Sequence, residues 1–150
     1  MTTWTKALPF FSASELACKG TGVVLLDFRF AVELIHLRST WDAPLTPSSV
    51  CRAPSHNEAV GGHPRSLHLT VPSHPQAHGT MAADFLWANW PTQRQLAFAA
   101  CAWDLGWAVG LNNAFCHVDL RSLIGRKPTV FTYGSGWSDR FGSRDVTEYV

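Results

Sequence analysis

The distribution of hydrophobic and polar residues predicts a first helix in the amino-terminal third of the chain. Across residues 27–40 the apolar side chains that recur at helical spacing are Phe28, Val32, Leu34 and Ile35. This spacing places them on one side of a helix. Glu33 and His36 are left for the outer face. Residues 27–40 are therefore predicted to be helical.

A second helix is predicted after Pro91. Thr92, followed three residues later by Gln95, has the form of a capping box, in which two side chains satisfy the free backbone groups at a helix start. Gly106 is a typical stop signal, because glycine adopts the conformation that ends many helices. Between these limits the helix would carry the apolar residues Leu96, Ala99, Ala100 and Trp103.

A β-hairpin is predicted immediately after the second helix. Asn112 and Asn113 separate the apolar segments 107–111 and 114–120, and asparagine tolerates the positive φ of a two-residue hairpin turn. Side chains alternate between the two faces of a strand. The second hairpin strand therefore carries Phe115, His117 and Asp119 on one face, so that an imidazole and a carboxylate lie side by side.

Three further strands are predicted at residues 48–52, 81–85 and 129–133. The strand at 81–85 contains one carboxylate, Asp84, which needs a polar partner if it is buried. Residues 55–80 between the first two strands hold five of the seven histidines, together with three prolines and three glycines, and are predicted to be mostly loop. This order of elements predicts an α+β fold, an antiparallel sheet with helices packed against it.

Composition and charge indicate a folded domain and exclude several classes of partner. Of the 150 residues 46% are hydrophobic and 15% charged, which is typical of globular proteins and fits a single domain over residues 1–150. Residues 134–150 are rich in Gly, Ser and charge and are predicted to form a wrapping tail. A net charge of +1 is too small for a nucleic-acid-binding surface. No apolar run is long enough to span a membrane.

The amino end and the cysteines narrow the cellular context. The opening MTTWTKALPFFSASEL lacks the apolar stretch of a secretory signal, so synthesis in the cytoplasm without export by this route is expected. The four cysteines contain no CxxC pair, which excludes zinc-finger and thioredoxin-like sites. They are interpreted as buried free thiols.

The polar residues on the predicted strands suggest a metal site. Catalytic zinc typically binds three protein ligands from His, Asp or Glu and keeps one position for water. His117, Asp84 and one histidine from the 56–78 loop would supply such a set. Residue types and spacing alone do not say which loop histidine it is.

Three ordered motifs resemble those of the zinc D-Ala-D-Ala carboxypeptidase family of peptidoglycan peptidases. The first is S-x-x-R-x-P-x-H-N-x-x-V-G-G, matched from Ser49 to Gly62, and it is followed by an S-x-H segment at Ser66 and His68. The second continues with Gly79 and the stretch that ends at Asp84, and the third is F-x-H-x-D at 115–119. The resemblance covers roughly residues 10–133, the motif-bearing core, and includes the opening segment 11–18.

The resemblance implies a role for each matched residue. It makes His68, Asp84 and His117 the zinc ligands and Arg52 the residue that binds the substrate, through a planar fork of donors suited to a carbonyl or carboxylate. Ser66 would orient its loop or contact the substrate. The alternative to this substrate-binding role is that Arg52 is a structural arginine bonded to backbone carbonyls.

The sequence departs from the family pattern in two places. Residues 70–78 are an insertion between the S-x-H segment and Gly79, so His74 or His78 is an alternative to His68 as ligand. The insertion itself is interpreted as a lid or specificity loop.

The second departure concerns the general base. Many relatives carry a carboxylate three residues before the last ligand, where this chain has Ala114. Asp119 is preferred as the base, with His74 and His78 as alternatives, and Asp119 is equally placed to orient the imidazole of His117.

Together these features predict a monomeric zinc peptidase with the fold shared by D-Ala-D-Ala carboxypeptidases and hedgehog-type signalling domains. Its expected substrate is a peptidoglycan stem peptide or cross-link, cut by zinc-activated water. The compact form suggests a phage endolysin that reaches the cell wall or periplasm after release. The rival hypothesis is a zinc-stabilised domain that binds wall peptide, or a virion protein, without catalysis, and Ala114 is its main support.

Overall fold

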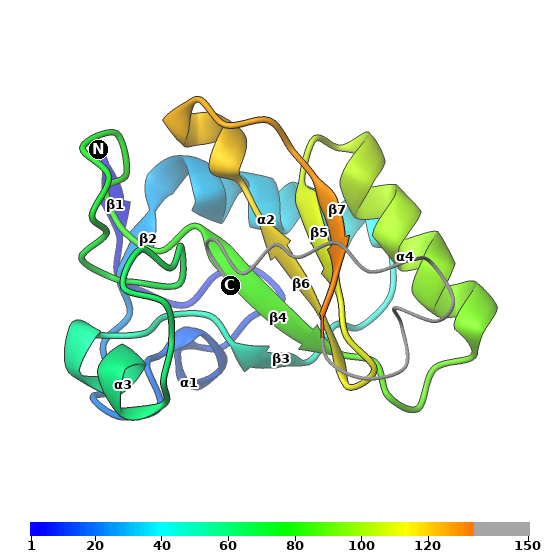
Figure 1. Cartoon of the computed structure of the whole chain (residues 1–150), viewed down its shortest axis with the longest axis horizontal. Coiled ribbons are helices and arrows are strands. Elements are labelled where there is room, and N and C mark those ends of the chain that lie inside the picture. Colours follow the sequence, from blue (N-terminus) through cyan, green and yellow to red (C-terminus); the bar gives the residue numbers. More distant parts are fainter. Residues whose placement is uncertain (134–150) are drawn as a thin grey trace.

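The computed structural model describes residues 1–133, and Figure 1 shows their arrangement. The predicted tail at 134–150 lies outside the described residues. Helices and strands are interspersed along the chain, so the predicted α+β class is confirmed. The elements are β1 (Thr3–Trp4), α1 (Ala13–Leu16), β2 (Leu26–Asp27), α2 (Phe28–Trp41), β3 (Pro47–Ser49), α3 (Pro54–Ala59), β4 (Ala82–Leu86), α4 (Thr92–Asp104), β5 (Ala108–Leu111), β6 (Phe115–Asp119), the 3₁₀ helix η1 (Arg121–Ile124) and β7 (Val130–Thr132).

The main sheet has five strands in the order β3-β4-β6-β5-β7, and β1 pairs with β2 in a separate two-stranded sheet. Neighbours in the main sheet are antiparallel except for β5 and β7, which are parallel. The predicted antiparallel sheet with packed helices is therefore present, with one parallel pair at the β7 edge. After β6 the chain passes through η1 and starts β7 at the end of the sheet where β5 also starts, so these two strands run in the same direction.

Helices α2 and α4 cover one face of the sheet, and α2 passes behind the strands in Figure 1. Phe85 of β4 packs edge-on against Phe98 of α4 at 5.9 Å between ring centroids, and Phe30 of α2 packs against Trp107 at 5.7 Å. These four rings are at most 1% exposed and form the centre of the core. Because successive strand residues point to opposite faces, the neighbouring Asp84 points away from the helices.

Helix α2 forms where the pattern predicts it, but its buried face is different. Asp27 caps the helix, since its carboxylate accepts a hydrogen bond from the backbone N–H of Arg29 at 3.0 Å. The buried side chains are Phe30, Ala31, Leu34 and Leu37, whereas Val32 is 47% exposed. The spacing 30, 34 and 37 also fits a helical face. Contact of Phe30 with Trp107 selects this face over the one that contains Val32.

Helix α4 begins without the predicted capping box. Pro91 is the N-cap residue and no side chain caps the helix. Instead, the amide of Gln95 is buried and donates a hydrogen bond to the carbonyl of Trp87 at 2.9 Å. A capping box does occur in α1, where Ser12 and Glu15 bond each other's backbone N–H groups. The loop that precedes α4 folds back on the helix. The side chain of Gln95 therefore bonds to the Trp87 carbonyl of this loop instead of capping the helix, as the sequence pattern had predicted.

The predicted hairpin is present, but its turn is not the predicted type. Leu111 pairs with Cys116, which leaves the four residues 112–115 between the paired positions, and neither asparagine has a positive φ. The side chain of Asn112 shapes the turn, because its Oδ1 accepts a hydrogen bond from Ala114 N at 2.9 Å. The same side chain donates to the carbonyl of Tyr133 at 3.2 Å and so ties the hairpin to the end of β7.

The segment between α3 and β4 is mostly irregular, as predicted, and its inserted part is anchored to the start of α2. The carboxylate of Asp27 is fully buried and accepts hydrogen bonds from Arg29 and from the backbone N–H of His78 at 3.0 Å. Arg29 also donates to the carbonyl of Gln76. Among the helices within residues 1–133, none is long and apolar enough to cross a bilayer.

The buried carboxylate of Asp27 gives a stability prediction that depends on pH. Burial raises its pKa, but the hydrogen bonds from Arg29 and His78 outweigh this and leave the pKa below its ordinary value. The carboxylate therefore contributes stability that is complete above the unfolded-state pKa of about 3.9 and is lost as the pH falls through the folded-state pKa. We expect Asp27→Asn to lower the free energy of unfolding by about 1–3 kcal/mol at pH 7.

The difference in the free energy of unfolding between Asp27→Asn and wild type should become smaller as the pH falls below about 4. Urea denaturation at several pH values measures it. Asp42→Asn is the matched control, because Asp42 is exposed and asparagine also tolerates its left-handed backbone. A difference for Asp27→Asn that stays constant down to pH 2.5 would contradict this role.

Candidate metal centre

The sheet brings Asp84 and His117 together. Asp84 on β4 and His117 on β6 are register partners in adjacent antiparallel strands, so their side chains leave the same face of the sheet. His117 Nδ1 lies 2.9 Å from Asp84 Oδ1. Both residues are buried, with 7% of Asp84 and 1% of His117 exposed. The alternation predicted for this strand is thus confirmed.

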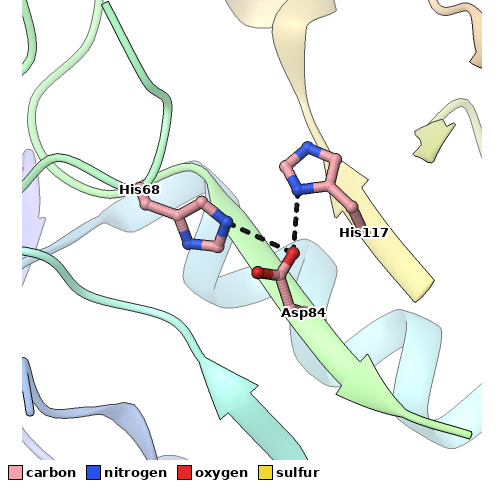
Figure 2. Close-up of side chains that lie close together, drawn as sticks. All are labelled: His68, Asp84 and His117. Atoms are coloured by element: carbon pink, nitrogen blue, oxygen red, sulfur yellow. Dashed lines mark hydrogen bonds and ion pairs between the residues drawn. The ribbon is translucent and has the colours of Figure 1, made fainter. Parts of the chain in front are cut away.

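A loop supplies the third member of the cluster. Figure 2 shows His68 and His117 approaching the same oxygen of the Asp84 carboxylate, His68 from its loop and His117 from β6. Its Nε2 lies 3.3 Å from Asp84 Oδ1, and one ligand atom from each of the three residues lies within 4.8 Å of the others. His74 and His78 belong to no such group among the described residues. The structure therefore brings together the three residues to which the resemblance assigned the metal.

The imidazole of His68 is held in the form that binds metal. Its Nδ1 donates a hydrogen bond to the carbonyl of Val50 at 2.8 Å, which leaves the lone pair of a neutral ring on Nε2. Burial lowers the pKa of His68, although the charge of Asp84 opposes this effect. Nε2 is itself buried and has no hydrogen-bond partner among the described residues. A metal ion between the three side chains would satisfy this nitrogen.

His117 is oriented by a second carboxylate. Its Nε2 donates to Asp119 Oδ2 at 2.8 Å, and Arg121 donates to both oxygens of the same carboxylate at 2.8–2.9 Å. Burial alone would lower the pKa of His117, but Asp119 and Asp84 raise it to about 9. The ring therefore carries a proton on Nδ1 when no metal is bound. A metal ion at this position would replace that proton, while Asp119 keeps the ring in place.

Arg52 lies beside the cluster and is itself held by side chains. Its Nε donates to Ser49 Oγ at 3.3 Å and its Nη1 donates to Asn57 Oδ1 at 3.1 Å. Its Nη2 lies 3.9 Å from Asp84 Oδ2. Within residues 1–133 the hydrogen bonds of this guanidinium go to side chains, whereas a purely structural arginine was expected to bond to backbone carbonyls. Arg52 therefore presents its remaining donors at the edge of the metal centre.

The other predicted site residues occupy supporting positions. Ser66 is fully buried, and its Oγ accepts a hydrogen bond from the backbone N–H of His68 at 3.2 Å, so it orients the ligand loop. A substrate contact by Ser66 stays a prediction. Both oxygens of Asp119 are engaged by His117 and Arg121, which supports its orienting role. Its role as general base stays a prediction as well.

Sequence reasoning missed the residues that hold Arg52. Asn57 is 3% exposed and donates to the carbonyl of His63 while it accepts from Arg52. A Cβ at Gly62 would collide with Asn57 Oδ1 and lie 2.8 Å from Arg52 Nη1, so a larger residue there would displace the two side chains that bond each other. Both residues stand in the first motif. Their position near Arg52 in that motif could have indicated that they support its side chain.

The geometry predicts the metal-binding behaviour of three variants. We expect wild type to bind one zinc ion per chain, and His68→Ala or His117→Ala to lower its zinc affinity by more than about 10²-fold, because loss of a supporting partner alone costs 10–100-fold. His36→Ala removes an exposed histidine of α2 and should bind zinc like wild type. Competition with a chromophoric chelator measures the affinities. Normal zinc binding by His68→Ala together with loss in His74→Ala or His78→Ala would reverse the ligand assignment.

Comparison with known proteins agrees with this geometry. The sequence model of the Peptidase M15 family matches residues 10–119, a range that contains every side chain of the metal centre. No curated protein and no solved structure gives a significant match. Peptidases of this family depend on zinc, and the described residues hold a His-Asp-His group suited to that metal. The chain therefore belongs to the Peptidase M15 family of zinc metallopeptidases.

Proposed function

We propose that this peptidase hydrolyses an amide bond in peptidoglycan, within a stem peptide or a cross-link. The observation that carries the proposal is the convergence of His68 Nε2, the Asp84 carboxylate and His117 Nδ1 beside the guanidinium of Arg52. Membership of the M15 family and the resemblance of the three motifs to peptidoglycan carboxypeptidases support the choice of substrate. An endolysin-like role, in which the protein reaches the wall after release, is part of this proposal.

In the proposed mechanism His68, Asp84 and His117 would hold zinc, which when bound would supply activation of a water molecule and polarisation of the scissile carbonyl. Asp119 fixes the His117 ring, and the hydrogen bond to Val50 fixes the His68 ring, so both nitrogens aim at one point. Arg52 donates hydrogen bonds to a carbonyl or carboxylate of the substrate and so positions the bond to be cut.

One observation favours a second candidate function. Ala114 is exposed at the hairpin loop and offers no carboxylate three residues before His117. A zinc-stabilised domain that binds wall peptide without cutting it would need no base at this position. Lysis of outer-membrane-permeabilised cells separates the candidates, because a binding domain would attach to walls without reducing the turbidity. Chelator should abolish such lysis and zinc should restore it if the protein is a peptidase.

Digestion of purified peptidoglycan tests the proposed function directly. We expect zinc-loaded wild type and His36→Ala to release fragments with new amino termini, which mass spectrometry identifies together with the bond cut. Loss of the metal should remove about 4 kcal/mol or more of transition-state stabilisation, so His117→Ala should be slower by roughly 10³-fold. Absence of release by wild type that retains stoichiometric zinc would instead support the binding domain.

Substitution of Arg52 tests its proposed contact with the substrate. Arg52→Lys keeps the positive charge but loses the planar fork and the bonds to Ser49 and Asn57. We expect kcat/KM to fall by about 10–100-fold, mainly through a higher KM, because a charge-assisted hydrogen bond contributes about 1.5–3 kcal/mol. Zinc content should not change. Arg38→Lys on α2 is the control, and equal KM values for the two variants would argue against a substrate contact by Arg52.

A further inference from the structure

An aromatic wall borders the metal centre on the β7 side. The ring of Phe131 lies 5.9 Å from the ring of His117, and the ring of Tyr133 stacks on Phe131 at 5.6 Å. Phe115 of β6 packs edge-on against Tyr133, also at 5.6 Å. Phe131 is buried, whereas Phe115 and Tyr133 are only partly buried. The partly exposed end of the wall is therefore formed by Tyr133 together with Phe115.

Gly110 lets these rings reach the metal centre across an intervening strand. Gly110 of β5 pairs with His117 on one side and with Phe131 on the other. A Cβ at this position would lie 2.6 Å from the Phe131 ring and 2.9 Å from the Tyr133 ring. The absence of a side chain on β5 thus leaves the space that both rings occupy. Tyr133 itself is fixed by a hydrogen bond from its backbone N–H to Leu111.

The phenol of Tyr133 interacts electrostatically with charged groups of the site. These include the carboxylates of Asp84 and Asp119 and the guanidinium of Arg52. Burial, reinforced by the charge of Asp84, raises the pKa of Tyr133 far above its ordinary value. The hydroxyl is consequently a neutral group that keeps its proton and is able to donate a hydrogen bond.

The two carboxylates of the described site are already engaged. Asp84 contacts both histidines, and Asp119 is bonded to His117 and Arg121. No acidic side chain comes from position 114. The carbonyl oxygen of the substrate gains negative charge during hydrolysis and is stabilised by hydrogen-bond donors aimed at it. A donor at the site that has no other partner could therefore act on this oxygen.

We propose that Tyr133 is a further catalytic residue, whose hydroxyl donates a hydrogen bond to the carbonyl oxygen of the scissile amide. Arg52 follows β3 and Tyr133 follows β7, the two edge strands of the sheet, so the two donors approach from opposite sides. Hydrolysis forms one C–O bond and breaks one C–N bond, with a proton of the attacking water passing to the leaving amine. Tyr133 keeps its own proton throughout. This inference rests on the proposed peptidase function.

Kinetics of two variants of Tyr133 on peptidoglycan form the first part of the test. Tyr133→Phe removes only the hydroxyl, and Tyr133→Leu also removes the ring. We expect each to lower kcat by about 10²-fold with little change in KM, the usual effect of losing one such donor. Zinc content should equal that of wild type. Thr129→Val deletes the hydroxyl of a partly buried residue just before β7, one that donates to the Lys127 carbonyl, and should leave kcat unchanged.

Binding of inhibitors gives a readout that does not need turnover. Three phosphinate pseudopeptides replace the amide of D-Ala-D-Ala, of D-Ala-diaminopimelate or of L-Ala-D-Glu by a tetrahedral anionic group. Tryptophan fluorescence measures their affinity for the zinc-loaded proteins. We expect at least one to bind wild type, and Tyr133→Phe to bind it about 10–100-fold more weakly.

The proposal would be overturned if Tyr133→Phe had the same kcat and the same phosphinate affinity as wild type. This would hold even if Tyr133→Leu were inactive, because only the aromatic ring would then matter. Failure of all three phosphinates to bind wild type would overturn it as well. Binding that depends on the Tyr133 hydroxyl, in a wild type that releases nothing from peptidoglycan, would reject the proposed function but support the contact. If wild type released fragments from peptidoglycan and Tyr133→Phe did so equally well, the proposed function would be supported and the contact by Tyr133 rejected.

Discussion

A carboxylate buried on a β-sheet is the constraint on which the rest of this structure depends. Asp84 points to the face of the sheet opposite the helices, and an isolated buried charge of this kind would be strongly unfavourable. Its negative charge is balanced by the protonated His117 and the guanidinium of Arg52, and the neutral ring of His68 converges on the same carboxylate from a third segment. Burial raises the pKa of Asp84, but these partners outweigh it and lower the pKa. The requirement to pair one charge thus organises the centre.

Each of these partners is positioned by a further contact. Strand register places His117, and Asp119 fixes its far nitrogen. His68 is held through its Nδ1 by a backbone carbonyl, and Arg52 is held by the side chains of Ser49 and Asn57. Metal sites gain affinity and geometry when the ligands are fixed before the ion arrives. The same supports leave Asp119 with both oxygens engaged by His117 and Arg121, which favours an orienting role for this carboxylate.

The sequence predicts those features that depend on local pattern or on motif order. Alternation along β6 was sufficient to place His117 and Asp119 on one face, and the ordered motifs identified His68 as the third member of the cluster. Contacts between distant segments were not predictable. Gln95 bonds to a loop carbonyl where the pattern implied a cap, because that loop folds back on α4. The position of Tyr133 beside the metal centre was not predictable from the sequence, because it depends on the pairing of β7 with β5.

His68, Asp84 and His117 converge in a way that would give one zinc ion only nitrogen and oxygen donors from the protein. X-ray absorption at the zinc edge, measured on the full-length zinc-loaded protein, tests this most directly. We expect a four-coordinate shell of nitrogen and oxygen at about 2.0–2.2 Å, with the multiple scattering of two imidazole rings. That spectrum should lose one imidazole in His68→Ala. Sulfur scatterers at about 2.3 Å, or a spectrum that His68→Ala leaves unchanged, would contradict this ligand set.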